Sequence, residues 1–138
     1  MPTISFLDHT ADVGFQVTAP TAAEAFIAAA EGMFDVMVDR HGVPAVETWP
    51  VEVKAEGWPE LLVAWLEELL WLYESQGMLP HSVLIGTIQE TGLRAVIEGD
   101  TYKPERDERK TQIKAVTYHQ LHAGETAEGY QIQVIFDI

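Results

Sequence analysis

Asp8-His9-Thr10-Ala11-Asp12 lies near the start of the chain, between two short apolar runs, and determines how those runs are placed. Residues 4–6 and 13–17 have the character of short strands, with Phe15 and Val17 spaced by two as a half-buried strand requires. The five residues between them are therefore expected in or beside a turn. They also bring two carboxylates, an imidazole and a hydroxyl together, which are the groups of half a binding site.

A first helix is predicted to begin after Pro20, because Thr21 and Glu24 have the spacing of a capping box. Its core-facing side is an apolar stripe at helical spacing, made of Phe26, Ala30, Met33 and Met37.

Two carboxylates close this helical pattern. Asp35 and Asp39 lie nearly opposite the apolar stripe, one turn apart and facing the same way. Carboxylates in the last turn meet the negative end of the helix dipole, so a positive group is expected beside them. Arg40, His41 or a bound cation could supply it, and a solvated acidic face is the plain alternative.

A second helix is predicted between Pro59, suited to a first helical turn, and Gly77, suited to a helix end. Further strands are predicted at residues 51–55, 83–89, 93–98, 113–117 and 130–136. The segment 103–110 reads as a polar loop that holds half of the basic residues. The expected fold is α+β: two main helices packed on a largely antiparallel β-sheet, in a single compact domain over residues 1–138.

The charge balance of the chain limits the classes of partner that it can bind. Eight Lys and Arg against 22 Asp and Glu give a net charge of −14, and 47% of the residues are hydrophobic. Proteins that bind nucleic acid neutralise phosphates with basic side chains, so direct RNA or DNA binding is not expected. A strongly acidic surface suits cations or a basic protein partner, although acidity can also serve solubility alone.

Several classes of chemistry lack their motifs. The chain has no cysteine, and it has no phosphate-binding glycine loop, H-E-x-x-H pair or G-x-S-x-G elbow. These absences argue against an enzyme that works alone. The longest apolar run, residues 61–73, contains Glu67 and Glu68 and is too short to span a bilayer. We therefore expect a cytoplasmic protein without membrane association.

The remaining candidates for chemistry are carboxylates. A carboxyl-terminal strand that ends beside the opening turn would gather Asp12, Asp39 and Asp137, together with the terminal carboxylate of Ile138. Such an all-oxygen site suits Ca²⁺, Mg²⁺ or Mn²⁺. Asp8 and His9 are assigned to shaping the turn. Three unrelated surface acids are the alternative in a chain of this composition.

Four blocks of the sequence resemble the archease family. They are Asp8-His9-Thr10-Ala11-Asp12-Val13, Met33-Phe34-Asp35-Val36-Met37-Val38-Asp39, Ile113-Lys114-Ala115-Val116-Thr117-Tyr118-His119, and the ending from Gly129-Tyr130 to Asp137-Ile138. The blocks span the chain in the order of that family.

The resemblance implies a small acidic accessory protein of the RtcB-type RNA-splicing ligase. Members of the family promote guanylylation of the ligase and its multiple turnover in tRNA splicing and RNA repair, so an activator and not a catalyst is implied. GTP and Mn²⁺ belong to the partner ligase. The resemblance also implies a divalent-cation site, which carries over onto Asp12, Asp39 and Asp137.

One segment departs from the family pattern. Gly99 to Asp107 resembles a G-E-x-Y-D-x-x-x-H loop, but Lys103 stands where an acid is usual and Asp107 where a histidine is usual. A role of this loop in partner contact is therefore open.

Two other functions are compatible with the residues. One is a chaperone-like protein-binding module without a metal role. The other is a metal-dependent phosphoesterase with Asp12 and Asp137 as ligands and His9 as general base.

Overall fold

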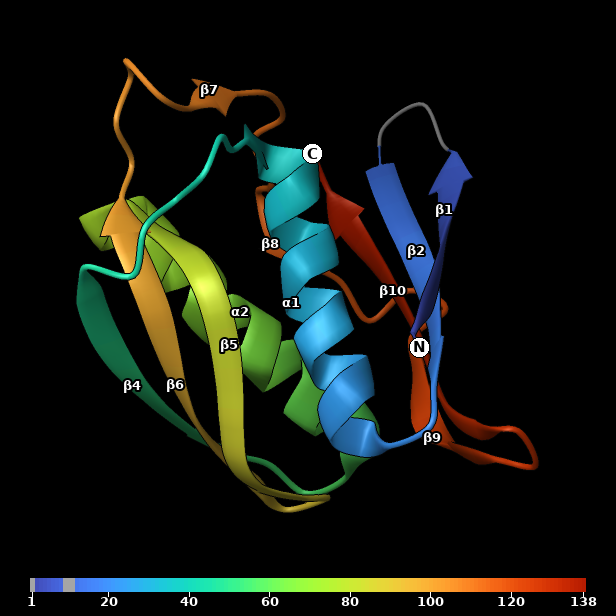
Figure 1. The fold of residues 1–138 in the computed structure, drawn as a ribbon. Helices are drawn as coiled ribbons and strands as arrows, with labels where there is room; N and C mark the ends of the chain where they lie inside the picture. The colour runs from blue at the N-terminus through green and yellow to red at the C-terminus, as the bar shows by residue number, and fades with distance from the viewer. Residues whose placement is uncertain (1, 9–11) are drawn as a thin grey trace.

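The two main helices lie between two antiparallel sheets in the computed structural model, which describes residues 2–8 and 12–138 (Figure 1). The five-stranded sheet has the order β1 (Thr3–Asp8), β2 (Asp12–Ala19), β10 (Gly129–Asp137), β8 (Ala115–Val116), and β9 (His122–Thr126) also pairs with β10. The three-stranded sheet has the order β4 (Glu47–Lys54), β6 (Gly92–Thr101), β5 (Met78–Gln89). A short ribbon joins β3 (Val38–Asp39) to β7 (Glu108–Arg109).

The helices are α1 (Ala22–Met37) and α2 (Trp58–Gln76), and each contacts strands of both larger sheets. The predicted α+β class with antiparallel strands is confirmed, with the strands divided between two faces of the helical layer. Among the described residues, no helix is long and apolar enough to span a membrane.

The start of α1 follows its sequence signal. The Thr21 hydroxyl accepts a hydrogen bond from the Glu24 amide at 3.2 Å, as the capping box predicts. The end differs from the prediction, because the helix stops at Met37 and Asp39 is not in its last turn. Val38 is extended and pairs with Arg109 of β7, so α1 ends where the β3–β7 ribbon begins.

Helix α2 has the predicted ends, with Pro59 in its first turn and Gly77 in the left-handed conformation at φ 74°. The fully buried Trp65 donates from its indole Nε1 to the Phe26 carbonyl at 3.0 Å, which ties the two helices together. The tryptophan is thus a structural residue. The strand predicted at residues 113–117 is shorter than expected, since only Ala115–Val116 pairs with β10.

The β2–β10 pairing positions the chain ends. Its register runs from Ala19 opposite Tyr130 to Asp12 opposite Asp137. Phe15 is buried against the helices, and Gln16 is exposed on the other face. The strands therefore carry Asp12 and Asp137 to the same end of the five-stranded sheet.

Candidate functional site

Asp12 and Asp137 are direct cross-strand partners at the end of the five-stranded sheet. Directly opposite residues project to one face, and strand alternation assigns this pair to the face of Gln16 and Gln133. Like charges placed directly opposite each other in a sheet repel. A positive group at this position would be stabilising. Ile138, the fourth predicted residue of the site, directly follows Asp137.

Asp39 lies on the short ribbon that follows α1. It is opposite Glu108 in the β3–β7 register, and its side chain is 53% exposed. His41 Nε2 lies 3.3 Å from Asp39 Oδ2, while the Arg40 guanidinium pairs with Asp35. Two of the candidate groups, Arg40 and His41, thus lie beside Asp35 and Asp39 respectively.

The segment 110–114 connects the Asp39 region to the end of β10. The Lys110 amide donates to the Met37 carbonyl at 2.8 Å, and the Lys114 amide donates to the Asp137 carbonyl at 2.7 Å. Four residue steps span at most about 14 Å. The end of α1 and the end of β10 therefore lie at one end of the molecule, where Figure 1 shows the carboxyl terminus next to α1.

The donor set fits a hard cation, because it consists of carboxylate oxygens. Within residues 2–8 and 12–138, however, no three His, Asp or Glu side chains lie close enough together to hold a metal ion. Asp8 ends β1 opposite Val13. His9 lies outside the described residues. The cation site at Asp12, Asp39, Asp137 and Ile138 stays a prediction, of which the structure places two members, Asp12 and Asp137, opposite each other.

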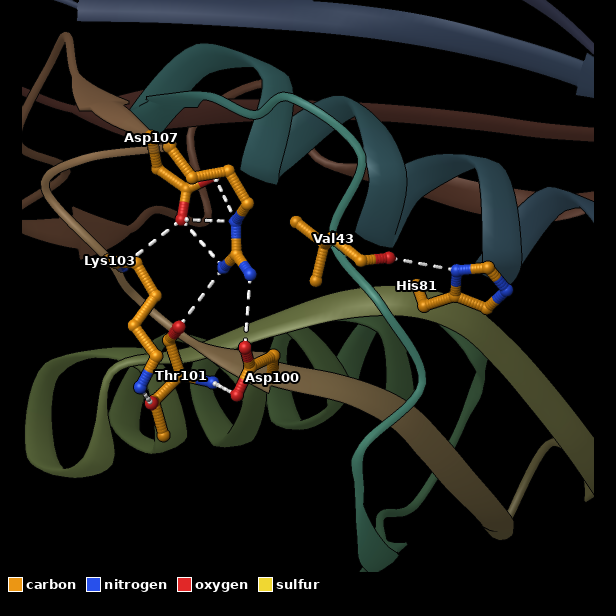
Figure 2. A network of polar contacts seen from close by, with 7 residues as sticks. Val43, His81, Asp100, Thr101, Lys103 and Asp107 are labelled. Carbon is orange, nitrogen blue, oxygen red and sulfur yellow. Dashed lines mark hydrogen bonds and ion pairs between the residues drawn. The ribbon is translucent and has the colours of Figure 1, made fainter.

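A buried ionic network lies in the Gly99 to Asp107 segment (Figure 2). Arg106 Nη1 is 2.9 Å from Asp100 Oδ2, and Arg106 Nη2 is 2.7 Å from Asp107 Oδ2. The Asp107 side chain has no exposed surface, and that of Arg106 is 18% exposed. Arg106 also donates to the Thr101 carbonyl at 3.1 Å. Arg106 therefore joins the start of this segment, at Asp100 and Thr101, to its end at Asp107.

Hydrogen bonding keeps both carboxyls of the network ionised. Burial favours the neutral form of Asp107, but the hydrogen bonds from Arg106 and from the Lys103 and His41 amides outweigh it, so the pKa of Asp107 lies below its ordinary value. The pKa of Asp100 is lowered mainly by its hydrogen bond from Arg106, with a further one from the Thr101 amide.

The network also reaches the candidate cation site. The Asp107 carboxylate accepts a hydrogen bond from the Lys103 amide at 3.1 Å, and the main chain at His41, two residues after Asp39, contributes to lowering its pKa. In Figure 2 the loop continues to Val43, whose carbonyl lies 2.9 Å from His81 Nδ1.

Sequence inspection missed this network, because the segment reads as a polar loop. The available signal is the residue choice itself: Asp107 replaces a histidine of the family pattern, directly after Arg106. Lys103, the other departure, donates from Nζ to the Thr101 hydroxyl at 2.9 Å.

Comparison with known proteins assigns the family. The model of the Archease protein family (MTH1598/TM1083) matches residues 5–138. The protein archease of Methanosarcina acetivorans is 37% identical over 137 residues, which cover 96% of this chain and 94% of that protein. The protein archease of Thermococcus kodakarensis is 38% identical over 126 residues, 88% of each chain. The solution structure of Methanobacterium thermoautotrophicum protein 1598 superposes with a TM-score of 0.79 at 32% identity, over 98% of each chain. The chain belongs to the archease family.

Proposed function

We propose that this protein is a non-catalytic activator of an RtcB-type RNA ligase, which promotes GTP-dependent guanylylation of the ligase and its multiple turnover in tRNA splicing and RNA repair. The family match over residues 5–138 carries the proposal. GTP and Mn²⁺ are bound by the partner ligase.

The acidic surface supports a partner of this kind. A net charge of −14 steers the protein toward basic surfaces, and an RNA ligase must present such a surface to hold its substrate. Activation requires that the protein bind the reactive conformation of the ligase more tightly than the unreactive one. The end of the molecule that holds the aspartates is the proposed contact.

A divalent cation completes the proposal. Asp12, Asp39, Asp137 and Ile138 would hold Ca²⁺, Mg²⁺ or Mn²⁺. A bound cation would offset the repulsion between the carboxylates and join the three segments that carry them. The protein's own contribution is the β2–β10 register, which places Asp12 and Asp137 opposite each other.

The test is single-turnover guanylylation of the cognate ligase, with and without this protein. Asp12→Asn, Asp39→Asn and Asp137→Asn are expected to reduce the stimulation roughly tenfold or more. Asp35→Asn is the matched control. The substitution removes one negative charge near the end of α1, but Asp35 pairs with Arg40 and is not a predicted ligand of the cation. The control should stimulate as the wild type does.

Two results would contradict the proposal at different points. If the wild-type protein fails to stimulate guanylylation, the activator role is wrong. If folded Asp12→Asn and Asp39→Asn proteins stimulate fully, the cation mechanism is wrong. Calorimetry with Ca²⁺, Mg²⁺ and Mn²⁺ separates the cases further, because the chaperone-like module without a metal role predicts no cation binding.

A further inference from the structure

A pocket of about 350 Å³ lies between the end of α1, the last turns of α2 and the chain that joins β7 to β8. Its apolar floor is made of the buried side chains Met37, Leu70 and Ile113. Its rim consists of Tyr73, Glu74, Arg109, Lys110, Thr111 and Gln112. A hollow of this volume, lined by both apolar and polar groups, falls in the size range of small-ligand sites.

Arg109 is held in place at the rim without a carboxylate. Its guanidinium carbon lies 4.1 Å from the centre of the Tyr102 ring, and its Nε donates to the Tyr73 hydroxyl at 3.2 Å. Its main chain pairs with Val38 in the β3–β7 ribbon. Stacking and hydrogen bonding therefore orient the guanidinium before any ligand arrives, which reduces the entropy lost on binding.

The missing carboxylate distinguishes Arg109 from the other arginines. Arg40 pairs with Asp35, Arg94 pairs with Glu52, and Arg106 pairs with two aspartates. Arg109 forms no ion pair in the part of the chain that the structure describes, although the protein has 22 acidic residues. Its two terminal nitrogens therefore remain available for an anion, and Lys110 adds a second positive charge to the rim.

Main-chain donors line the same edge. The Lys110 and Lys114 amides are used by the Met37 and Asp137 carbonyls. The three amides between them, at residues 111–113, have no main-chain acceptor among the described residues. A ligand with its own carbonyl or carboxylate oxygens could accept hydrogen bonds from this edge.

We propose that this pocket binds an organic carboxylate with an apolar body. The body lies on the floor of Met37, Leu70 and Ile113, and the carboxylate accepts hydrogen bonds from the Arg109 guanidinium in a forked pair. Glu74, the acid on the rim, opposes a second negative charge on the ligand. The carboxylate can belong to a free acid or to the carboxyl terminus of a peptide.

The test uses the full chain without the ligase, so its result does not depend on the proposed function. Phenylacetate and N-acetylglycylphenylalanine are titrated against protein with labelled methyl groups, and the methyl signals of Met37, Leu70 and Ile113 report binding. Phenylacetamide, which lacks the charge, should produce no saturable shift. A peptide that binds roughly tenfold tighter than phenylacetate assigns the pocket to peptide termini, and equal affinities assign it to free acids.

Variants separate the pocket from general charge effects. Arg109→Gln is expected to weaken binding of both acids roughly tenfold or more, and Glu74→Gln to strengthen it about twofold. Arg94→Gln, on the outer face of the three-stranded sheet, removes the same charge and should leave binding unchanged. If Arg109→Gln does not fold, Lys110→Gln replaces it, with an expected loss of about threefold. The proposal is overturned if neither acid shifts the three methyl signals, or if the shifts are the same in the folded arginine or lysine variant.

Discussion

Asp107 is a side chain with no exposed surface whose partners are all donors: the Arg106 guanidinium and the amides of Lys103 and His41. A buried carboxylate of this kind is tolerated because its charge is matched and its oxygens are hydrogen-bonded. The same bonds join two loops that are far apart in sequence. The Asp107 carboxylate thus lies close to the main chain at His41, two residues after Asp39.

Removing the partner of Asp107 should destabilise the fold. Arg106→Met leaves a buried carboxylate without its counter-charge, and we expect the free energy of unfolding to fall by about 3 kcal/mol. Urea denaturation followed by fluorescence measures the change. Arg94→Met is the control, because the exposed Arg94–Glu52 pair should contribute less than about 1 kcal/mol. Equal losses in the two variants would show that the network contributes no more than a surface pair.

The network also predicts the response to acid. The pKa values of Asp100 and Asp107 lie below the ordinary value in the folded protein, so the unfolded chain takes up protons at a higher pH. Their contribution to stability is present above about pH 4 and is lost as the pH falls toward the folded-state pKa values. Urea midpoints measured from about pH 6 to about pH 3 should fall, and Arg106→Met should flatten this dependence. A dependence as steep in the variant as in the wild type would contradict the assignment.

At the scale of elements, the close approach of β2 and β10 brings the candidate aspartates together. A Cβ at Gly14 would lie 2.5 Å from the Val134 carbonyl oxygen and 2.9 Å from the Ile135 side chain. The strands can therefore approach this closely only with glycine at the position. This contact lies two residues from Asp12, so it determines the spacing of the Asp12–Asp137 pair.

Gly14→Ala should force the strands apart and lower the free energy of unfolding by about 1–3 kcal/mol. Gly124→Ala in β9 of the same sheet is the matched control, because a Cβ there meets nothing within 4 Å. Thermal unfolding of the two variants compares them directly, and amide exchange in β2 and β10 should rise in Gly14→Ala alone. A Gly14→Ala protein as stable as the control would show that the strands can move apart without cost.

At the scale of the whole molecule, the helices hold the two sheets together. Phe34 of α1 contacts the Tyr73 ring of α2, with ring centres 6.0 Å apart, while Phe26 packs against Tyr130 of β10 at 6.2 Å. Trp49 of β4 donates to the Gln76 side chain at the end of α2, at 2.9 Å. Neither sheet can separate from the helices without exposing this shared core.

The chain should therefore unfold as one unit, in agreement with the predicted single domain of residues 1–138. Tryptophan fluorescence and far-ultraviolet circular dichroism are expected to give superimposable urea curves. Hydrogen exchange should assign similar opening free energies to the most protected amides of β6 and β10. Two separated transitions, one for each sheet, would contradict this expectation.

Local signals in the sequence were sufficient for much of the architecture. The capping box at Thr21, the prolyl start and glycyl end of α2, and the alternation in the long strands each depend on residues a few positions apart. Asp12 and Asp137 belong together only if the last strand ends beside the opening turn, which the sequence supposed and the β2–β10 register shows. The family resemblance likewise came from short blocks, and the comparisons confirmed it.

Tertiary structure decided the features that depend on distant partners. Helix α1 ends at Met37, earlier than predicted, because Val38 pairs with Arg109, some seventy positions further along the chain. The buried network of Arg106 was hidden in a polar loop, since a charged residue reveals its partner only when the chain has folded. The division of the strands into two sheets around the helices also depends on contacts between residues that are distant in sequence. Periodicity says which face of each element is apolar, and only packing decides which elements cover it.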